Sequence, residues 1–358
     1  MPSLKEIKGR INSISSTLAI TSAMKMVASA KLQKAQMAIQ NMLPYERRLY
    51  SMLVDLMGAM NISAAASEDG SVRGSGSAER GFDQSGDRLS LSNRHDLAGM
   101  DGAYSLMAQR EVRKVAIVAF ASNSSLCGAF NSNAIREATA VINEYRASGL
   151  GDADITVYSV GRKMAEAMKK LGFPSPADFT KMSDSPSYDA ASALAQELFD
   201  GFVSGRFDKV ELVYNHYKST SSQPTTRQTY LPLSLADATA DIQVGKITDS
   251  ASESDTNRGA EPVGAPVVRQ GSPTTEDLIV EPSKEELIAT LLPKVVRLRV
   301  FTTLLDSTAA EQAARTVAMQ LATDNGNDLL QELTLEYNKG RQQKITSEIL
   351  DLVGGSLQ

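Results

Sequence analysis

Apolar residues recur at alternating spacings of three and four along the first 60 residues of the chain. The positions in this series are Leu4, Ile7, Ile11, Ile14, Leu18, Thr21, Lys25, Ala28, Leu32, Ala35, Ile39 and Met42, followed by Leu49, Leu53, Leu56 and Met60. Only Thr21 and Lys25 interrupt the apolar character of the first twelve positions. A seven-residue repeat that continues for so long predicts a coiled-coil helix, with a local kink at Pro44.

A second helical pattern runs from Ser283 to Leu352. Ser283 and Glu286 have the spacing of a capping box at its start, and Pro293 is expected to kink it. An average helix has about 11–12 residues, whereas this one would be on the order of 100 Å long. A helix of that length needs a partner, and the first 60 residues repeat with the same heptad spacing. The sequence therefore predicts that the two ends of the chain pair into a rod.

One tetrapeptide disturbs the second pattern. Thr323, Asp324, Asn325 and Gly326 are all mediocre to poor helix formers. They are consistent with a turn between two helices. They are also consistent with a continuous helix that carries a small polar patch, because sequences often break local rules at functional sites. Both interpretations remain open at this point.

The middle of the chain alternates between strand-like and helix-like segments. Expected strands cover 113–121, 154–160, 209–217 and 225–233, and expected helices cover 134–146, 162–171 and 188–203. This alternation predicts a Rossmann-like α/β domain with a largely parallel sheet.

Gly- and Ser-rich polar stretches flank this domain and indicate inserted loops. The predicted division is 1–60, a coiled-coil helix; 61–110, an insertion; 111–233, the α/β domain; 234–276, a second insertion; and 277–358, the other coiled-coil helix.

Charge and composition narrow the functional classes. The net charge of −5 argues against a nucleic-acid-binding protein. Residues 1–45 are nevertheless basic, which suits either an acidic partner or a solvated helix face. The basic residues there are Lys5, Lys8, Arg10, Lys25, Lys31 and Lys34, against the single acid Glu6. Because no apolar run reaches 18 residues, no transmembrane helix is expected.

Candidate chemistry is sparse. The chain has one cysteine, Cys127, and two histidines, His95 and His216. An internal disulfide needs two cysteines. A zinc site or a Cys–His or Ser–His catalytic pair is also not favoured, because so few of the necessary residues are present. We expect no catalytic, metal or cofactor site. The segment 126–131 (LCGAFN) could cradle a phosphate, but a tight turn with a buried Cys127 is favoured because the chain contains neither G-x-G-x-x-G nor G-x-x-x-x-G-K-[ST].

Two functional alternatives follow from the residues alone. The chain could be a nucleotide- or phosphate-binding α/β enzyme with helical flanks, although no phosphate loop is visible. It could instead be a coiled-coil adaptor or tether, which explains the rod but not the α/β domain between its helices.

Four short segments resemble one known family. Residues 311–326 (EQAARTVAMQLATDNG) closely resemble the C-terminal signature of the gamma subunits of F-type ATP synthases. Residues 20–28 (ITSAMKMVA) look like the N-terminal signature of that family, 126–128 (LCG) match its central turn, and 337–339 (YNK) match its last helix. The matches lie in the family's order and spacing, and only the two insertions fall outside them.

The resemblance implies a fold and a role. In this family the terminal helices form an antiparallel coiled coil that enters a ring of alternating alpha and beta subunits. The α/β domain lies at the base, beside the epsilon subunit and the c-subunit ring. Such a subunit is the central rotor shaft that couples ion flow to ATP synthesis or hydrolysis, with no active site of its own. The implied location is peripheral, on the cytoplasmic face of a bacterial cell membrane, with membrane association only through the complex.

The resemblance also implies contact residues for the catalytic ring. Met24 and Lys25 match the segment that faces moving acidic loops of beta subunits. On the opposing helix, the matching contact residues are Gln312, Arg315, Thr323, Asp324 and Asn325. Met24 could instead be plain coiled-coil packing, and Arg315 could pair with Glu311 within one helix. The chain departs from the family at 123–125 (NSS), where charged residues and a glycine are usual.

Overall fold

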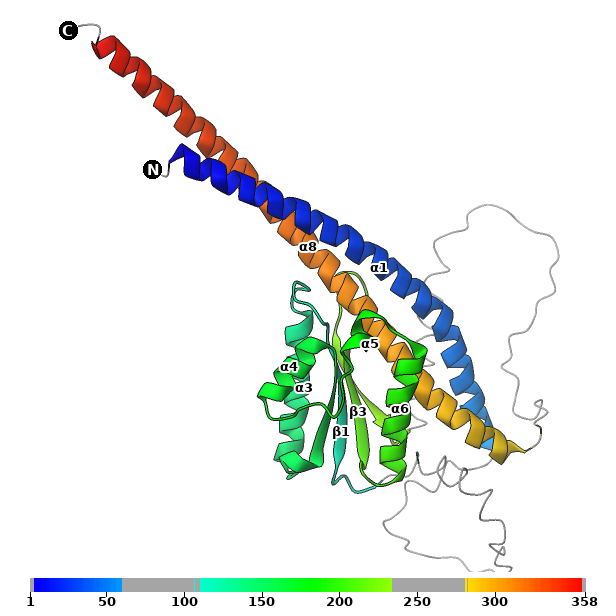
Figure 1. The fold of residues 1–358 in the computed structure, drawn as a ribbon. Coiled ribbons are helices and arrows are strands. Elements are labelled where there is room, and N and C mark those ends of the chain that lie inside the picture. Colours follow the sequence, from blue (N-terminus) through cyan, green and yellow to red (C-terminus); the bar gives the residue numbers. More distant parts are fainter. Residues whose placement is uncertain (1–2, 60–105, 107–109, 234–280, 282, 356–358) are drawn as a thin grey trace, which may run out of the picture.

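The computed structural model describes residues 3–59, 106, 110–233, 281 and 283–355. Its dominant feature is a rod of two helices, α1 (Leu4–Ala59) and α8 (Lys284–Gly355), drawn in Figure 1. Both helices continue through the prolines that were expected to kink them, Pro44 and Pro293. The Ser283 Oγ accepts a hydrogen bond from the Glu286 N–H at 3.2 Å, as half of the predicted capping box. The predicted pairing of the chain ends is confirmed.

The two helices run antiparallel, and their termini mark this clearly in Figure 1. The surface along which α1 and α8 meet is the seam of the rod. All twelve heptad positions from Leu4 to Met42, which were expected to lie in this seam, are buried or half-buried. Two glycines of α8 face two leucines of α1 that are two heptads apart. A Cβ added to Gly340 would lie 3.1 Å from Leu4 Cδ2, and one added to Gly326 would lie 2.7 Å from Leu18 Cδ2. The glycines are therefore holes that receive leucine side chains across the seam.

The segment 323–326 is part of the unbroken helix α8, which excludes a turn there. Gly326 is needed for the close approach of Leu18, and the Thr323 hydroxyl donates to the Thr21 hydroxyl at 3.1 Å. Two of the four residues, Thr323 and Gly326, therefore make contacts between the two helices of the rod. Tertiary packing outweighs the poor helix propensity of the tetrapeptide.

A sheet domain (residues 110–233) packs against one side of the rod. Its strands are β1 (Val115–Phe120), β2 (Ile155–Val160), β3 (Lys209–Asn215) and β4 (Thr225–Leu231), in the order β2-β1-β3-β4. β1 pairs in parallel with both β2 and β3, and β4 is antiparallel to β3. The largely parallel sheet predicted from the sequence is confirmed.

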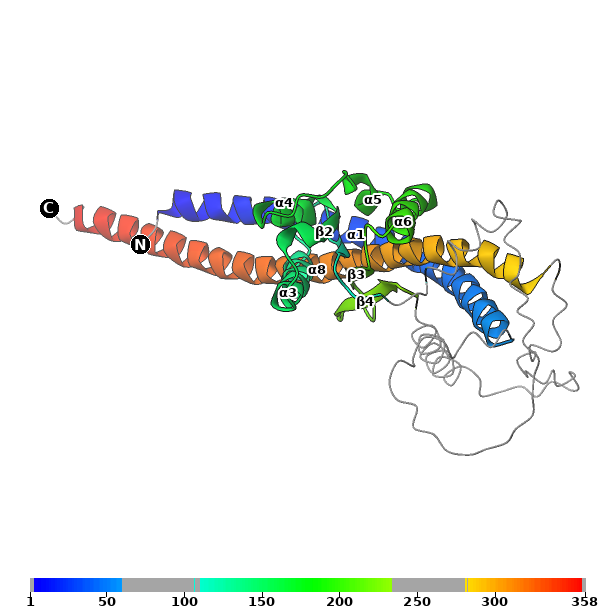
Figure 2. The same ribbon diagram turned by 90° about the horizontal axis from the view of Figure 1, so that it is seen from below.

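Helices cover both faces of this sheet. The helices are α3 (Phe130–Ala147), α4 (Arg162–Lys170), the short α5 (Thr180–Asp184) and α6 (Tyr188–Val203), with a 3-10 turn, η2, at Asp152–Asp154. Alternate residues of β1 point to opposite faces: Ile117 packs in the core with α3 and α4, and Val118 in the core with α6 and the rod. Figure 2 shows the rod passing the whole sheet domain and extending beyond it.

Several boundaries differ from the sequence-based expectation. α3 begins at Phe130 rather than at 134, and α5 was not expected. β4 ends at Leu231, before Pro232, which cannot donate to a strand ladder. β3 ends at Asn215, so the next two residues leave the sheet. Of the predicted insertions, 61–110 is described only at Leu106, which is buried in the core, and at Arg110, and 234–276 lies outside the described residues.

A buried ionic cluster holds α3 to strands β3 and β4. The carboxylate of Glu211, 1% exposed, accepts hydrogen bonds from the Tyr145 hydroxyl at 2.6 Å and from Arg227 Nε at 2.7 Å, and it pairs with Lys209 Nζ at 2.7 Å. Arg227 also bonds Glu144. Burial pushes the pKa of Glu211 upward, but the hydrogen bonds from Arg227, Lys209 and Tyr145 outweigh that effect and leave the pKa below its ordinary value.

Substitution of Gly326 tests the seam. Gly326→Ala is expected to lower the free energy of unfolding of the full chain, because overpacking of the new methyl group against Leu18 costs about 1–3 kcal/mol and outweighs a helix-propensity gain of about 0.5–1 kcal/mol. Gly9→Ala is the matched control, since nothing lies within 4 Å of a Cβ at Gly9. It should raise the same quantity by about 0.5–1 kcal/mol. Urea denaturation followed by circular dichroism measures both, and equal stability of the two variants would contradict the leucine–glycine seam.

The Glu211 cluster predicts a specific acid dependence of stability. Because the folded-state pKa lies below the ordinary value of 4.5, the unfolded chain binds more protons, and the contribution of Glu211 is lost as the pH falls below 4.5. Glu211→Gln should remove up to about 1.4 kcal/mol per pH unit from the acid slope of the unfolding free energy. Glu166→Gln, at an exposed ion pair with Lys163, controls for the loss of a surface carboxylate and should change the free energy of unfolding at neutral pH by less than about 1 kcal/mol. An unchanged slope in Glu211→Gln would refute the assignment.

Candidate functional site

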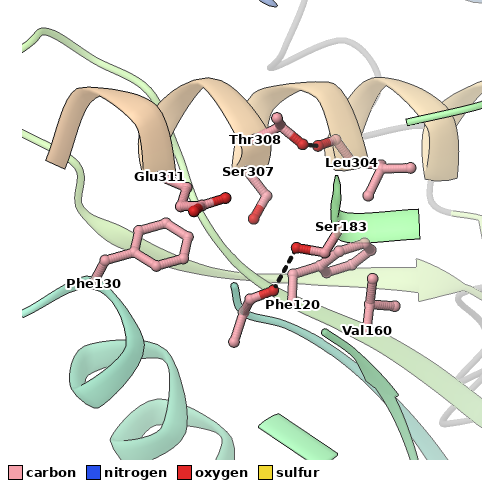
Figure 3. Close-up of a pocket in the computed structure, with 9 residues that line it drawn as sticks. Phe120, Phe130, Val160, Ser183, Leu304, Ser307, Thr308 and Glu311 are labelled. Atoms are coloured by element: carbon pink, nitrogen blue, oxygen red, sulfur yellow. Dashed lines mark hydrogen bonds between the residues drawn. The ribbon is translucent and has the colours of Figure 1, made fainter. Parts of the chain in front are cut away.

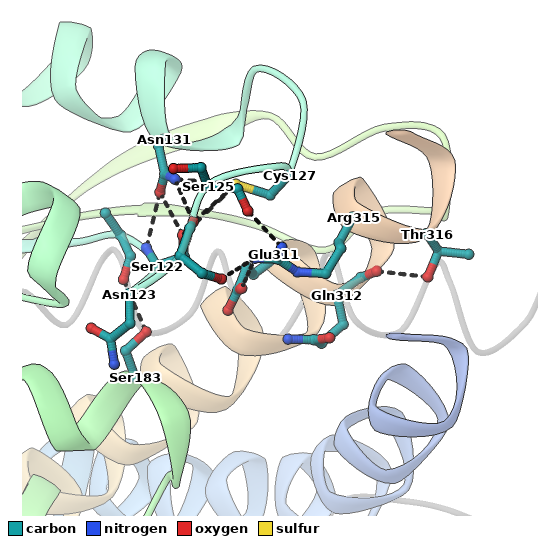
Figure 4. A network of polar contacts seen from close by, with 12 residues as sticks. Ser122, Asn123, Ser125, Cys127, Asn131, Ser183, Glu311, Gln312, Arg315 and Thr316 are labelled. Carbon is teal, nitrogen blue, oxygen red and sulfur yellow. Dashed lines mark hydrogen bonds and ion pairs between the residues drawn. The ribbon is translucent and has the colours of Figure 1, made fainter. Parts of the chain in front are cut away.

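The turn between β1 and α3 lies against the rod and is shaped by the side chain of Asn131. Its amide oxygen accepts from the Ser122 N–H at 3.0 Å, and its amide nitrogen donates to the Ser124 carbonyl at 3.2 Å and to the Cys127 sulfur at 3.1 Å. Cys127 is buried, and Gly128 takes a positive φ of 58° that brings the turn close to α8. Residues 126–129 therefore form a tight turn into α3 and Cys127 is buried, as the favoured interpretation predicted, while residues 130 and 131 already belong to the helix (Figure 4).

Arg315 of α8 fastens this turn to the rod. Its guanidinium donates to the Ser125 carbonyl at 2.7 Å and to the Ser124 hydroxyl at 2.8 Å, and it pairs with the Glu311 carboxylate at 2.7 Å (Figure 4). The Arg315–Glu311 pair was one of the alternatives raised by the sequence, and both residues are 7% exposed. Burial raises the pKa of Glu311, and the hydrogen bond and charge of Arg315 offset that effect only in part.

A small cavity lies beside this pair, between α8 and the sheet. Its volume is about 10 Å³, and Figure 3 shows Phe120, Phe130, Ser183 and Glu311 among its walls. A single water needs about 10–15 Å³, so a nucleotide does not fit. The other notable depression, about 320 Å³ and open to solvent between α6 and α8, is lined by Asp189, Ser192, Ala193, Gln196 and Arg297.

Within the described ranges, no group of three or more His, Cys, Asp or Glu side chains is arranged to hold a metal ion. The helices of these ranges also include none whose length and apolar character would suit a membrane span.

The structure separates the seven predicted contact residues into two groups. Gln312 and Arg315 are both buried, and Arg315 contacts the turn of the sheet domain. The others lie farther along the rod, where the Thr21–Thr323 hydrogen bond brings the two helices together. In this second group Met24, Lys25 and Thr323 are half-buried, and Asp324 and Asn325 are exposed.

Sequence reasoning missed the contacts that join the sheet domain to the rod. Ser124 and Ser125 stood out only as a departure from the family pattern, yet they are the partners of Arg315. Asp306 was not singled out, although it accepts hydrogen bonds from residues 216 and 217. The sequence did contain a signal for this contact, because Asp306 is an acidic residue within the apolar pattern of α8, directly after Leu305 and before several small residues.

Comparison with known proteins decides the family. A family model described as ATP synthase matches residues 3–357. The ATP synthase gamma chain of Phocaeicola vulgatus is 47% identical over 357 residues, which cover all of both chains. The chain belongs to the ATP synthase gamma-chain family.

Further relatives agree with this assignment. The gamma chains of Bacteroides thetaiotaomicron and Flavobacterium psychrophilum are 45% and 34% identical over nearly the full length of each chain. These alignments span the chain from end to end, including the ranges 61–110 and 234–276. Among solved structures, a chain of the Euglena gracilis mitochondrial ATP synthase (OSCP, F1 and c-ring) matches 98% of this chain and 92% of its own length, with a TM-score of 0.51 and 19% identity. This last match supports the fold alone.

Loss of the Arg315 guanidinium should destabilise the gamma chain. Arg315→Ala leaves the Glu311 carboxylate buried without its partner, which is expected to lower the free energy of unfolding by about 3 kcal/mol. Adding Glu311→Gln to that variant should recover part of the loss. Arg10→Ala, which breaks an exposed pair with Glu6 at the same four-residue spacing, should cost less than about 1 kcal/mol. Equal effects of Arg315→Ala and Arg10→Ala in urea denaturation would contradict this account.

Proposed function

We infer that this gamma chain is the central rotor shaft of an F-type ATP synthase. It couples ion flow through a membrane ring to conformational change, and so to ATP synthesis or hydrolysis, in the catalytic subunits. The observation that carries this inference is the long antiparallel rod, whose far end exposes apolar side chains.

That far end is the last part of α8. Gly340 faces Leu4 at the start of α1, and α8 continues to Gly355, so among the described residues α1 does not extend alongside the final turns of α8 (Figure 1). Apolar side chains are nevertheless exposed there, at Ile345, Ile349, Leu350, Leu352 and Val353. A contiguous exposed apolar surface favours a protein partner. An apolar collar inside a ring of alpha and beta subunits is a partner of suitable shape.

The charge of the rod is distributed unevenly between its two helices. The basic side chains of the segment 1–45 lie on α1. On α8, an exposed acidic residue occurs at every fourth position, at Asp324, Asp328, Glu332 and Glu336. Such a rod presents a different face to each of three identical catalytic subunits. A partner shifts a conformational equilibrium only through different contact energies with its states. Rotation would therefore change the nucleotide affinity of each site in turn, and by linkage hydrolysis would drive the rod in reverse.

The ring contacts belong to this proposal. Met24, Lys25, Asp324 and Asn325 lie where the rod surface is accessible, which supports contact with the alpha and beta subunits. Thr323, Gln312 and Arg315 are engaged within the chain, so a ring contact would use their remaining surface or act through their neighbours.

The remaining assignments concern the whole complex. We assign no catalytic residues to the gamma chain itself. The sheet domain, at the other end of the rod, is the surface for the epsilon subunit and the c-subunit ring. The gamma chain would then be peripheral, on the cytoplasmic face of a bacterial membrane, and held there only through the complex.

Reassembly tests the rotor function. The full gamma chain, co-expressed with the alpha and beta subunits of its own cell, is expected to purify as an ATP-hydrolysing complex and to support ATP-driven ion pumping once joined to the membrane part. Lys25→Glu should lower pumping severalfold, because a like charge would face acidic loops of the beta subunit. The measurements are phosphate release and acidification of inverted membrane vesicles.

Lys25→Arg is the matched control, since it keeps the charge at the same position of α1. Its pumping should remain near that of the native chain. A gamma chain that purifies without alpha and beta subunits, and leaves ATP hydrolysis and pumping unchanged when omitted, would rule out the rotor function. A native pumping rate in Lys25→Glu would remove only this residue from the contact surface.

A further inference from the structure

The connection between β3 and β4 leaves the sheet and reaches the rod. β3 ends at Asn215, and the next residue, His216, places its Nδ1 at 2.6 Å from an oxygen of Asp306 on α8. The backbone N–H of Tyr217 donates to the other carboxylate oxygen of Asp306 at 2.8 Å. One carboxylate of the rod thus holds two consecutive residues of the sheet domain.

Tyr217 also reaches the other rod helix. Its hydroxyl accepts a hydrogen bond from the side-chain amide of Gln36, on α1, at 2.6 Å. Its ring packs against two apolar clusters that meet at this point. The first cluster is formed by Leu32, Ala35, Ala309 and Ala313, and the second by Cys127, Phe130 and Ala310. A single residue of the sheet domain therefore lies among α1, α8 and the start of α3.

The seam is built from small side chains at this level. Ala35 of α1 meets Ala309 and Ala313 of α8, all of them buried. Small residues let the helices approach closely, but each buries little apolar area, and apolar contact is non-directional. Hydrogen bonds require defined distances and angles, so the bonds of Tyr217 fix the rotational position of both helices where packing alone fixes it weakly.

We propose that Tyr217, held by Asp306, is a clasp that transmits torque from the sheet domain to both helices of the rod. Without the clasp, a torque applied to the sheet domain would reach α1 through the α1–α8 seam, across its small-residue section. With the clasp in place, the same torque acts on both helices directly, so α1 and α8 rotate together. The proposal rests on the rotor function inferred above, in which Tyr217 is a positioning residue.

Two variants test the clasp in the reassembled complex. Tyr217→Phe removes the acceptor of the Gln36 amide and keeps the ring, and Asp306→Ala removes both bonds to the connection. Both variants should assemble and hydrolyse ATP, but the number of ions pumped per ATP should fall about twofold or more. In Tyr217→Phe, hydrogen exchange of residues 28–39 of α1 should accelerate about fivefold, as expected for one lost hydrogen bond.

Two further variants serve as controls. Tyr158→Phe also removes one tyrosine hydrogen bond, to Glu197, but within the sheet domain, and it should change neither measurement. Asp306→Asn retains an oxygen that can accept from the Tyr217 N–H, and it should restore most of the pumping ratio lost in Asp306→Ala.

The outcomes separate this proposal from the rotor function. If the native chain fails to couple hydrolysis to pumping, the rotor function itself is wrong. If the native chain couples and Tyr217→Phe keeps the native pumping ratio, the clasp is overturned, even where exchange in α1 is faster, because the residue would then be merely structural. If Asp306→Ala does not assemble, Tyr217→Phe alone decides.

Discussion

The rod depends on one antiparallel register between helices from opposite ends of the sequence. Leu4 and Leu18 of α1 enter spaces left by Gly340 and Gly326 of α8, two heptads apart on both helices. Near the base, the buried Glu46 of α1 pairs with Arg299 of α8 at 3.1 Å. A slip of one residue would drive leucines against larger side chains and move Glu46 away from Arg299. The register also decides which residues face outward and thus which faces the rod can present to a ring.

The sheet domain depends on that rod for part of its apolar core. One face of its sheet is closed by α3 and α4, and the other is closed by α6 together with α8 of the rod, in an apolar core that also includes residues of α1. The Tyr230 hydroxyl, donating to the Val296 carbonyl of α8 at 2.9 Å, extends this attachment. Because the rod supplies part of the core, the sheet domain has a fixed orientation on it. Rotation of the sheet domain must therefore also rotate the rod.

The sequence was most informative where periodicity is strong. The heptad positions, the largely parallel sheet and the family could all be predicted, because apolar spacing and short motifs are local properties of the chain. The tetrapeptide 323–326 was ambiguous, since its helix depends on Leu18, which is distant in sequence. The same limit explains Arg315: spacing revealed its pairing with Glu311, but only the fold places Ser124 and Ser125 beside its guanidinium. Tyr217 was assigned to a strand, because nothing local shows that Asp306 draws it away.

The junction combines two kinds of interaction with different mechanical properties. Apolar packing supplies most of the adhesion between the sheet domain and the rod, but it permits small rotations at little cost where the side chains are alanines. Arg315 and Asp306 lie about two and a half turns apart on α8, and each binds a different connection of the sheet domain through side-chain and backbone groups. Two directional attachments separated along an axis resist twisting as well as tilting, whereas one attachment would act as a pivot. Polar contacts are costly to bury, and a subunit that carries torque has a physical reason to retain them at this level of the rod.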